Sequence, residues 1–108
     1  MTVDDLIFVG LNGYVAALHR ENGAIVWSNN ELKRGYVTMM LDGDRLIVST
    51  NGYIYCLAPL TGRIVWHNPM KGYGLATASL VSTRGSSGAT SVVQSEEDDR
   101  DRRRRRSD

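Results

Sequence analysis

The chain has 108 residues and a formal net charge of +1. A single Cys excludes an internal disulfide, and the balance of 13 Lys or Arg against 12 Asp or Glu argues against a broadly basic, nucleic-acid-binding fold. No apolar run reaches the roughly 18 residues that a membrane helix needs. The start of the chain, with Asp4 and Asp5, is acidic where a signal peptide is basic. We therefore expect a cytoplasmic protein with no membrane segment.

Composition divides the chain into two parts. Residues 1–83 hold nearly all the apolar side chains, whereas residues 84–108 are mostly Ser, Gly, Asp, Glu and Arg. Such a tail cannot bury enough surface to offset the entropy of ordering. We expect one folded domain over 1–83, and a disordered Ser/Gly linker with a mixed-charge, Arg-rich tail over 84–108. A core of about 80 residues gives only marginal stability, so support from other subunits is expected.

Short apolar runs follow one another along the folded part. They are rich in β-branched and aromatic residues and have the length of strands, not of helices. Most are apolar at consecutive positions, so both faces of the sheet must be covered. In chain order the predicted strands are residues 6–9, 14–18, 24–27, 36–41, 46–48, 53–57, 63–66 and 75–81.

Turn residues between these runs recur at a fixed spacing. Asn-Gly pairs accept positive φ at both positions, as a two-residue hairpin turn requires, so neighbouring strands are predicted to be antiparallel. A shift of 39 residues (13 to 52, 27 to 66) superposes the whole pattern without a gap. The repeated turn residues are Asn12, Gly13 and Gly23 in the first copy, and Asn51, Gly52 and Gly62 in the second.

A period near 40 residues indicates one supersecondary unit per repeat, which buries its faces against copies of itself. Small antiparallel sheets covered on both faces are typical of β-propeller blades stacked around an axis. A two-sheet sandwich is the rival architecture, but its outer faces would need polar residues that these strands lack.

The two copies carry a recognisable motif. Residues 17–27 read Ala-Leu-His-Arg-Glu-Asn-Gly-Ala-Ile-Val-Trp, and residues 56–66 read Cys-Leu-Ala-Pro-Leu-Thr-Gly-Arg-Ile-Val-Trp. This pattern resembles the tryptophan-motif blade of the quinoprotein propellers, which are named for pyrroloquinoline quinone (PQQ). His19 and Ala58 stand where that family has Asp.

The resemblance implies an all-β fold of about two four-stranded, antiparallel propeller blades per chain. It places Trp27 and Trp66 at the ends of outer strands, where each indole docks between neighbouring blades. Residues 6–9, the first predicted strand, are the counterpart of residues 46–48, the second strand of a blade, so the first blade lacks an inner strand. Residues 75–81 repeat the inner strand of the second blade, residues 36–41. We therefore expect several identical chains to exchange the strand 75–81 and to complete the propeller ring as a homo-oligomer.

Few residues indicate chemistry. His19 and His67 occupy non-equivalent repeat positions, and Cys56 replaces Ala17 at a position that suits a small buried side chain. The glycines lack the strand-to-helix setting of a phosphate loop. Four carboxylates lie at predicted strand starts or turns, and we interpret them as solvated turn residues, not as a calcium site: Asp4, Asp5, Asp42 and Asp44. We predict no catalytic residue, metal or cofactor.

The preferred functional hypothesis is a noncatalytic structural or interaction module that binds an unknown protein partner. One alternative is polyanion or nucleic-acid binding through Arg102, Arg103, Arg104, Arg105 and Arg106. A second alternative is a quinoprotein-type, PQQ-binding enzyme whose site lies at the centre of the oligomer. Fold resemblance alone does not decide between these functions.

Deletion of residues 95–108 tests the division of the chain. Because these residues supply no core side chains, we expect the melting temperature to change by less than about 2 °C. A polyanion shift assay at two salt concentrations, run on both forms, tests the arginines. A loss of many degrees on deletion would place the tail inside the folded unit.

Overall fold

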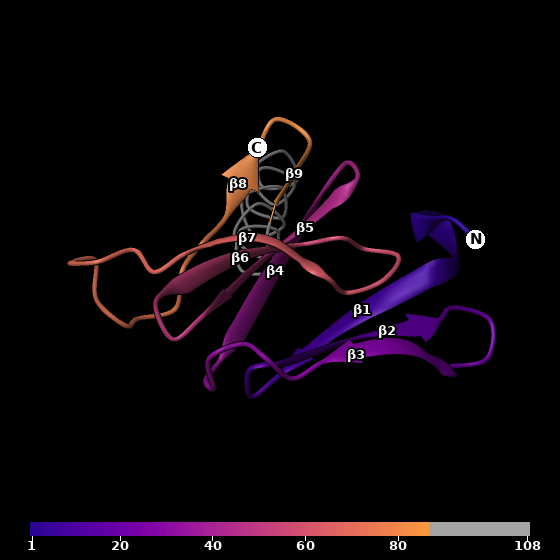
Figure 1. Ribbon diagram of the computed structural model, residues 1–108. Helices are drawn as coiled ribbons and strands as arrows, with labels where there is room; N and C mark the ends of the chain where they lie inside the picture. The colour runs from indigo at the N-terminus through magenta and orange to yellow at the C-terminus, as the bar shows by residue number, and fades with distance from the viewer. Residues whose placement is uncertain (87–108) are drawn as a thin grey trace, which may run out of the picture.

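A computed structural model describes residues 1–86, and all its regular structure is β apart from one short 3-10 turn, Val3–Asp5 (Figure 1). The arginines 102–106 and most of the predicted tail lie outside these described residues. The turn is fastened to the chain start, because the Thr2 amide donates to the Asp5 carboxylate at 2.8 Å. This hydrogen bond lowers the pKa of Asp5.

Two antiparallel sheets follow in chain order. The first sheet contains β1 (Leu6–Leu11), β2 (Tyr14–His19) and β3 (Ile25–Asn29), in the order β1-β2-β3. The second sheet contains four strands in sequential order: β4 (Val37–Asp42), β5 (Arg45–Thr50), β6 (Tyr53–Leu57) and β7 (Ile64–Asn68). The fold is therefore all-β with two blade-like meanders, as predicted, and these two sheets do not close a ring (Figure 1).

The predicted strand over 75–81 is the exception. Residues 75–80 form no strand, and only Val81–Ser82 (β8) pairs with Gly85–Ser86 (β9), in a small separate hairpin. An extended segment becomes a strand only when a neighbouring backbone supplies a hydrogen-bonded ladder. Here the segment instead crosses the far face of the second sheet, where the Ala78 carbonyl accepts from Thr38 Oγ1 at 3.0 Å.

The Asn-Gly turns have the conformation that their sequence favours. Asn12 and Asn51 have φ of 53° and 49°, and the following glycines, Gly13 and Gly52, both have φ of 82°. Strand pairing continues up to the residues on either side of each turn, so each hairpin has a two-residue loop. A Cβ at Gly13 would also overlap the backbone of Lys33. The turn glycine is therefore required by its neighbour as well as by its φ.

The main core lies between the two sheets. One face of the first sheet packs against one face of the second, and the second sheet is also covered on its far face by a smaller cluster. Five consecutive residues of β5, from Leu46 to Thr50, are consequently buried. The main cluster comprises Leu6, Val15, Ala17, Trp27, Leu32, Leu46, Val48, Tyr55 and Leu57, and the smaller one is built on Met40, Ile47 and Cys56.

Within residues 1–86, no helix is long and apolar enough to span a membrane.

Two leucines provide a matched test of this core. Leu57 is fully buried in β6, whereas Leu60, in the turn that follows, is 44% exposed. We expect Leu57→Ala to lower the free energy of unfolding by about 2–5 kcal/mol and Leu60→Ala by less than about 1 kcal/mol. Denaturant unfolding measures both, and equal losses would contradict the assignment of the core.

Candidate interaction site

Two side chains of β3 hold the second sheet against the first. The indole Nε1 of Trp27 donates to the Pro59 carbonyl at 2.8 Å, and the amide Nδ2 of Asn29 donates to the Gly62 carbonyl at 2.7 Å. Both hydrogen bonds are buried, and both acceptors belong to the turn between β6 and β7. The first sheet therefore supplies two donors and the second sheet two backbone acceptors. We call this pair of contacts the interblade clamp.

The clamp depends on a glycine. Gly62 has φ of 79°, and a Cβ there would overlap the six-membered ring of Trp27. On the first sheet, Phe8 packs against the same indole, with ring centroids 6.2 Å apart. The absence of a side chain at Gly62 thus allows the indole to approach the backbone of the turn closely.

The linker between the sheets is fixed by the second sheet. The Lys33 amide donates to the Tyr55 hydroxyl at 3.1 Å, and the Lys33 carbonyl accepts from Thr50 Oγ1 at 2.9 Å. On the other side, the Arg34 guanidinium lies 3.9 Å from the centre of the Tyr14 ring. These contacts join the two sheets along the linker as well as at the clamp.

The donor residues of the clamp recur in β7, where they are exposed. Trp66 and Asn68 lie 39 positions after Trp27 and Asn29 (27 to 66, 29 to 68). Trp66 is 46% exposed, compared with 9% for Trp27, and Asn68 is also exposed. The predicted docking of Trp66 between blades therefore stays a prediction.

The acceptor residues recur in the β2–β3 turn, where they too are exposed. Arg20 and Gly23 are the counterparts of Pro59 and Gly62 (20 to 59, 23 to 62). Gly23 has φ of 75°, but a Cβ there would meet no atom within 4 Å. Among the described residues, this second acceptor turn is open.

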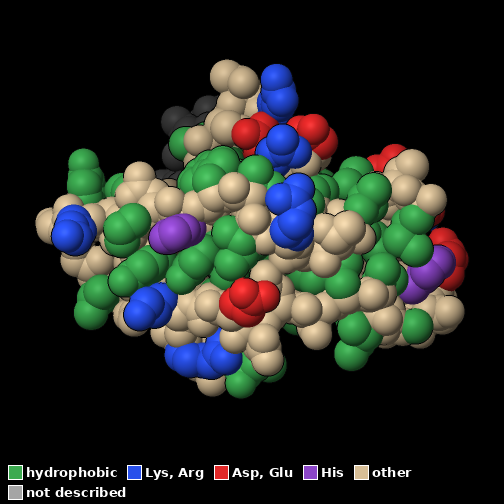
Figure 2. All heavy atoms as spheres, viewed as in Figure 1, with side chains coloured by type: hydrophobic (Ala, Val, Ile, Leu, Met, Phe, Trp, Pro, Cys, Tyr) green, Lys and Arg blue, Asp and Glu red, His purple; other side chains and the backbone are tan. Residues whose placement is uncertain are grey.

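One face of the first sheet is also open. Ile7 and Val9 are 49% and 40% exposed, whereas their counterparts Leu46 and Val48 are 1% and 0% exposed. Hydrophobic side chains reach the surface across the view of Figure 2, interspersed with charged and polar ones. The open face, defined by Ile7, Val9, Ala16 and Leu18, carries the repeat positions that are buried in the second sheet.

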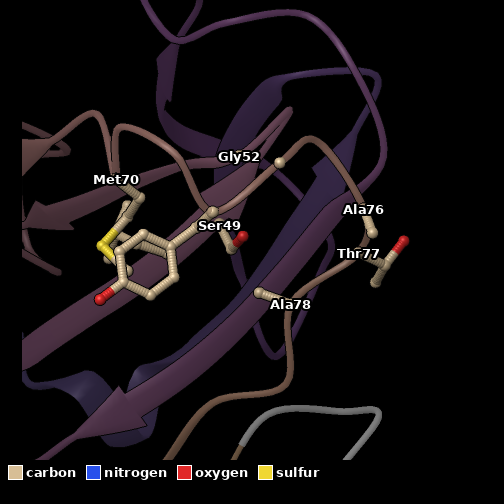
Figure 3. Close-up of a pocket in the computed structure, with 9 residues that line it drawn as sticks. Ser49, Gly52, Met70, Ala76, Thr77 and Ala78 are labelled. Atoms are coloured by element: carbon tan, nitrogen blue, oxygen red, sulfur yellow. The ribbon is translucent and has the colours of Figure 1, made fainter.

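A cavity of about 220 Å³ lies on the far face of the second sheet. Ser49 forms part of its floor, and Ala76, Thr77 and Ala78 run along one side (Figure 3). Ser49 is the counterpart of Gly10, which packs against Val37 and Met39 between the sheets. The lining residues are Ser49, Gly52, Ile54, Met70, Tyr73, Gly74, Ala76, Thr77 and Ala78. By the repeat, the cavity on the second sheet therefore corresponds to the space next to the first sheet that the second sheet fills.

The remaining candidates do not form a reactive cluster. His19 Nδ1 accepts from the Glu21 amide at 3.4 Å, while the His67 ring stacks on Tyr55 with centroids 6.1 Å apart. Cys56 is buried, and burial raises the pKa of its thiol. Within residues 1–86, no three His, Cys, Asp or Glu side chains are grouped so that they could hold a metal ion. The carboxylate Oδ1 of Asp42 instead lies 4.0 Å from the guanidinium Nε of Arg84.

Sequence reasoning missed half of the clamp. The sequence predicts a docking role for Trp27, but none for Asn29 or for the carbonyls of Pro59 and Gly62. A signal for Asn29 does exist, because an Asn follows each Trp by two positions in both repeats. Backbone acceptors leave no such signal, since every residue type has a carbonyl.

The clamp and the two blade-like sheets together define a PQQ-like β-propeller fold. The family model described as outer membrane protein assembly factor BamB matches residues 4–100, and the chain belongs to this family of PQQ-like repeat proteins. A search of curated proteins finds no match to the chain.

Two glycines with the same backbone conformation test the clamp. Gly62→Ala and Gly23→Ala introduce similar strain at positive φ, about 1–2 kcal/mol each, but only Gly62→Ala also displaces Trp27. We expect Gly62→Ala to lower the free energy of unfolding by at least about 1 kcal/mol more. Denaturant unfolding of dilute protein measures the difference, and equal losses would show that the indole does not rest on this turn.

Proposed function

We propose that the chain is a noncatalytic protein-interaction module, which binds polypeptide of blade-type β-structure on the open face of its first sheet. The observation that carries this proposal is the contrast between equivalent positions of the two repeats. Val48 is fully buried and Val9 is 40% exposed, although both are Val at the same place in the blade. A solvated sheet face would carry polar residues at these positions.

The edge of the first sheet supports the same proposal. β1 is the edge strand of the described sheet, whereas its counterpart β5 is paired on both sides, by β4 and β6. An open strand edge next to an apolar face is the surface to which an added strand binds, with backbone hydrogen bonds at the edge and side-chain contacts on the face. A partner that supplies both contacts is a β-structured polypeptide.

The family description also points to a polypeptide partner. The matching family is named for a factor in the assembly of outer membrane proteins. Such a role needs surfaces that recognise protein. The thiol of Cys56 is buried and His19 and His67 lie in separate settings, so these three residues do not form a nucleophile–base pair.

A peptide titration tests the proposed function. The probe is a short synthetic peptide of alternating valine and threonine with a lysine at each end, followed by NMR of the backbone amides. We expect saturable shifts centred on residues 6–11. Val9→Lys places a charge on the open face and should abolish these shifts. Leu60→Lys, at a turn position that is 44% exposed compared with 40% for Val9, should preserve them.

A parallel titration with PQQ separates this function from the enzymatic alternative. We expect no saturable shift on addition of PQQ. Saturable PQQ binding, together with an absence of peptide shifts at residues 6–11, would overturn the proposal.

A further inference from the structure

We infer that the partner is a second copy of this chain, docked head to tail through a second interblade clamp between molecules. This inference rests on the proposed function and names its partner. Trp66 and Asn68 of one copy donate to the carbonyls of Arg20 and Gly23 of the next. We call Trp66 and Asn68 the donor end, and the Arg20 and Gly23 carbonyls the acceptor end.

The clamp inside the chain provides the template. Trp27 and Asn29 donate to Pro59 and Gly62, and the repeat places the same two donor types in β7. The open face of the first sheet corresponds, by the 39-residue repeat, to the face of the second sheet that packs against the first sheet. A rotation that carries the first sheet onto the second therefore carries the internal interface onto the proposed one.

The donor end already has the required local geometry. Asn68 Oδ1 accepts from the Met70 amide at 2.8 Å, as Asn29 Oδ1 accepts from the Glu31 amide at 2.8 Å. This contact fixes which end of the amide faces outward, so that Nδ2 remains as the donor. Asn68 is thus oriented as Asn29 is in the internal clamp.

The acceptor end is equally prepared. In the β2–β3 turn the Gly23 amide donates to the His19 carbonyl at 2.7 Å, and in the β6–β7 turn the Gly62 amide donates to the Ala58 carbonyl at the same distance. The two glycines have φ of 75° and 79°. The space above Gly23 is open within the chain, whereas the space above Gly62 holds the Trp27 indole. A second copy's Trp66 fits the place that Trp27 occupies internally.

The segment 76–79 fits the open edge of β1. It repeats residues 37–40, which pair with β5 such that Thr38 lies opposite Ser49 and Met39 opposite Val48. The same register between copies places Thr77 opposite Gly10 and Ala78 opposite Val9. Residues 76–79 form no strand within one chain, and pairing would give this segment a hydrogen-bonded ladder.

Three substitutions between the repeats make the proposed contact weaker than the internal one. Ala16 stands where the Tyr55 hydroxyl accepts from the Lys33 amide, and Leu11 stands where Thr50 donates to the Lys33 carbonyl. Lys71 stands where Leu32 is buried. The contact between copies therefore lacks two hydrogen bonds and one apolar anchor. We expect association that is reversible and depends on protein concentration.

Complementary variants provide the test. Asn68→Asp keeps the oxygen that binds Met70 but replaces the donor by a second oxygen, which repels the Gly23 carbonyl. Gly23→Ala leaves the donor end intact and closes the space for Trp66. By sedimentation, we expect the unchanged chain to form species larger than one chain, and each variant alone to associate at least about tenfold more weakly.

Mixing the two variants gives the decisive result. One intact donor end and one intact acceptor end remain in the mixture, so we expect a dimer with one copy of each variant, and nothing larger. The mixing experiment is repeated with Trp66→Ala in place of Asn68→Asp, as a second variant whose donor end is impaired. Gly43→Ala, in a β4–β5 turn at φ of 57°, controls for positive-φ strain away from both ends. Circular dichroism confirms that each variant is folded.

The outcomes are distinct from those of the peptide titration. Folded variants that associate like the unchanged chain, or a mixture that remains as single chains, would overturn the head-to-tail contact. Peptide binding at residues 6–11 would then still support the proposed function with a different partner.

Discussion

The hydrogen bond from the Trp27 indole to the Pro59 carbonyl is the contact on which the rest of the structure depends. It joins a side chain of the first sheet to a backbone turn of the second, at 2.8 Å and out of contact with water. An unpaired N–H in that position would cost roughly 1–3 kcal/mol, so the indole fixes where the turn must lie. Asn29 repeats the arrangement on the Gly62 carbonyl of the same turn. The apolar packing between the sheets supplies most of the stabilisation, while these two donors tie β3 to the β6–β7 turn.

The same blade design has opposite consequences in the two repeats. In the second sheet, both faces are covered and β5 is buried over five consecutive residues, from Leu46 to Thr50. In the first sheet, the corresponding face is apolar but exposed at Ile7 and Val9. The repeat positions that lack their usual neighbours are therefore the surface on which the proposed interaction depends.

The sequence is sufficient to predict the period, the hairpin turns and the family, because each depends on local signals. Asn12-Gly13 and Asn51-Gly52 determine their hairpins through backbone conformation alone. Within the single chain the predicted strand over 75–81 forms only at Val81, because an apolar run does not reveal whether a partner edge is present, and its exchange between chains stays a prediction. The interblade clamp was only half visible, since its acceptors are backbone carbonyls. Likewise, Trp27 and Trp66 look equivalent in sequence, and only their surroundings separate the buried indole from the exposed one.

Hydrogen exchange of the two indole N–H groups, followed by NMR over a range of protein concentrations, tests the central claim most directly. The Trp27 N–H should exchange slowly at every concentration, because its acceptor Pro59 is in the same chain. The Trp66 N–H should exchange quickly in dilute protein and become protected as the concentration rises and copies dock. Protection of Trp66 that does not change with concentration, or fast exchange at Trp27, would contradict the account.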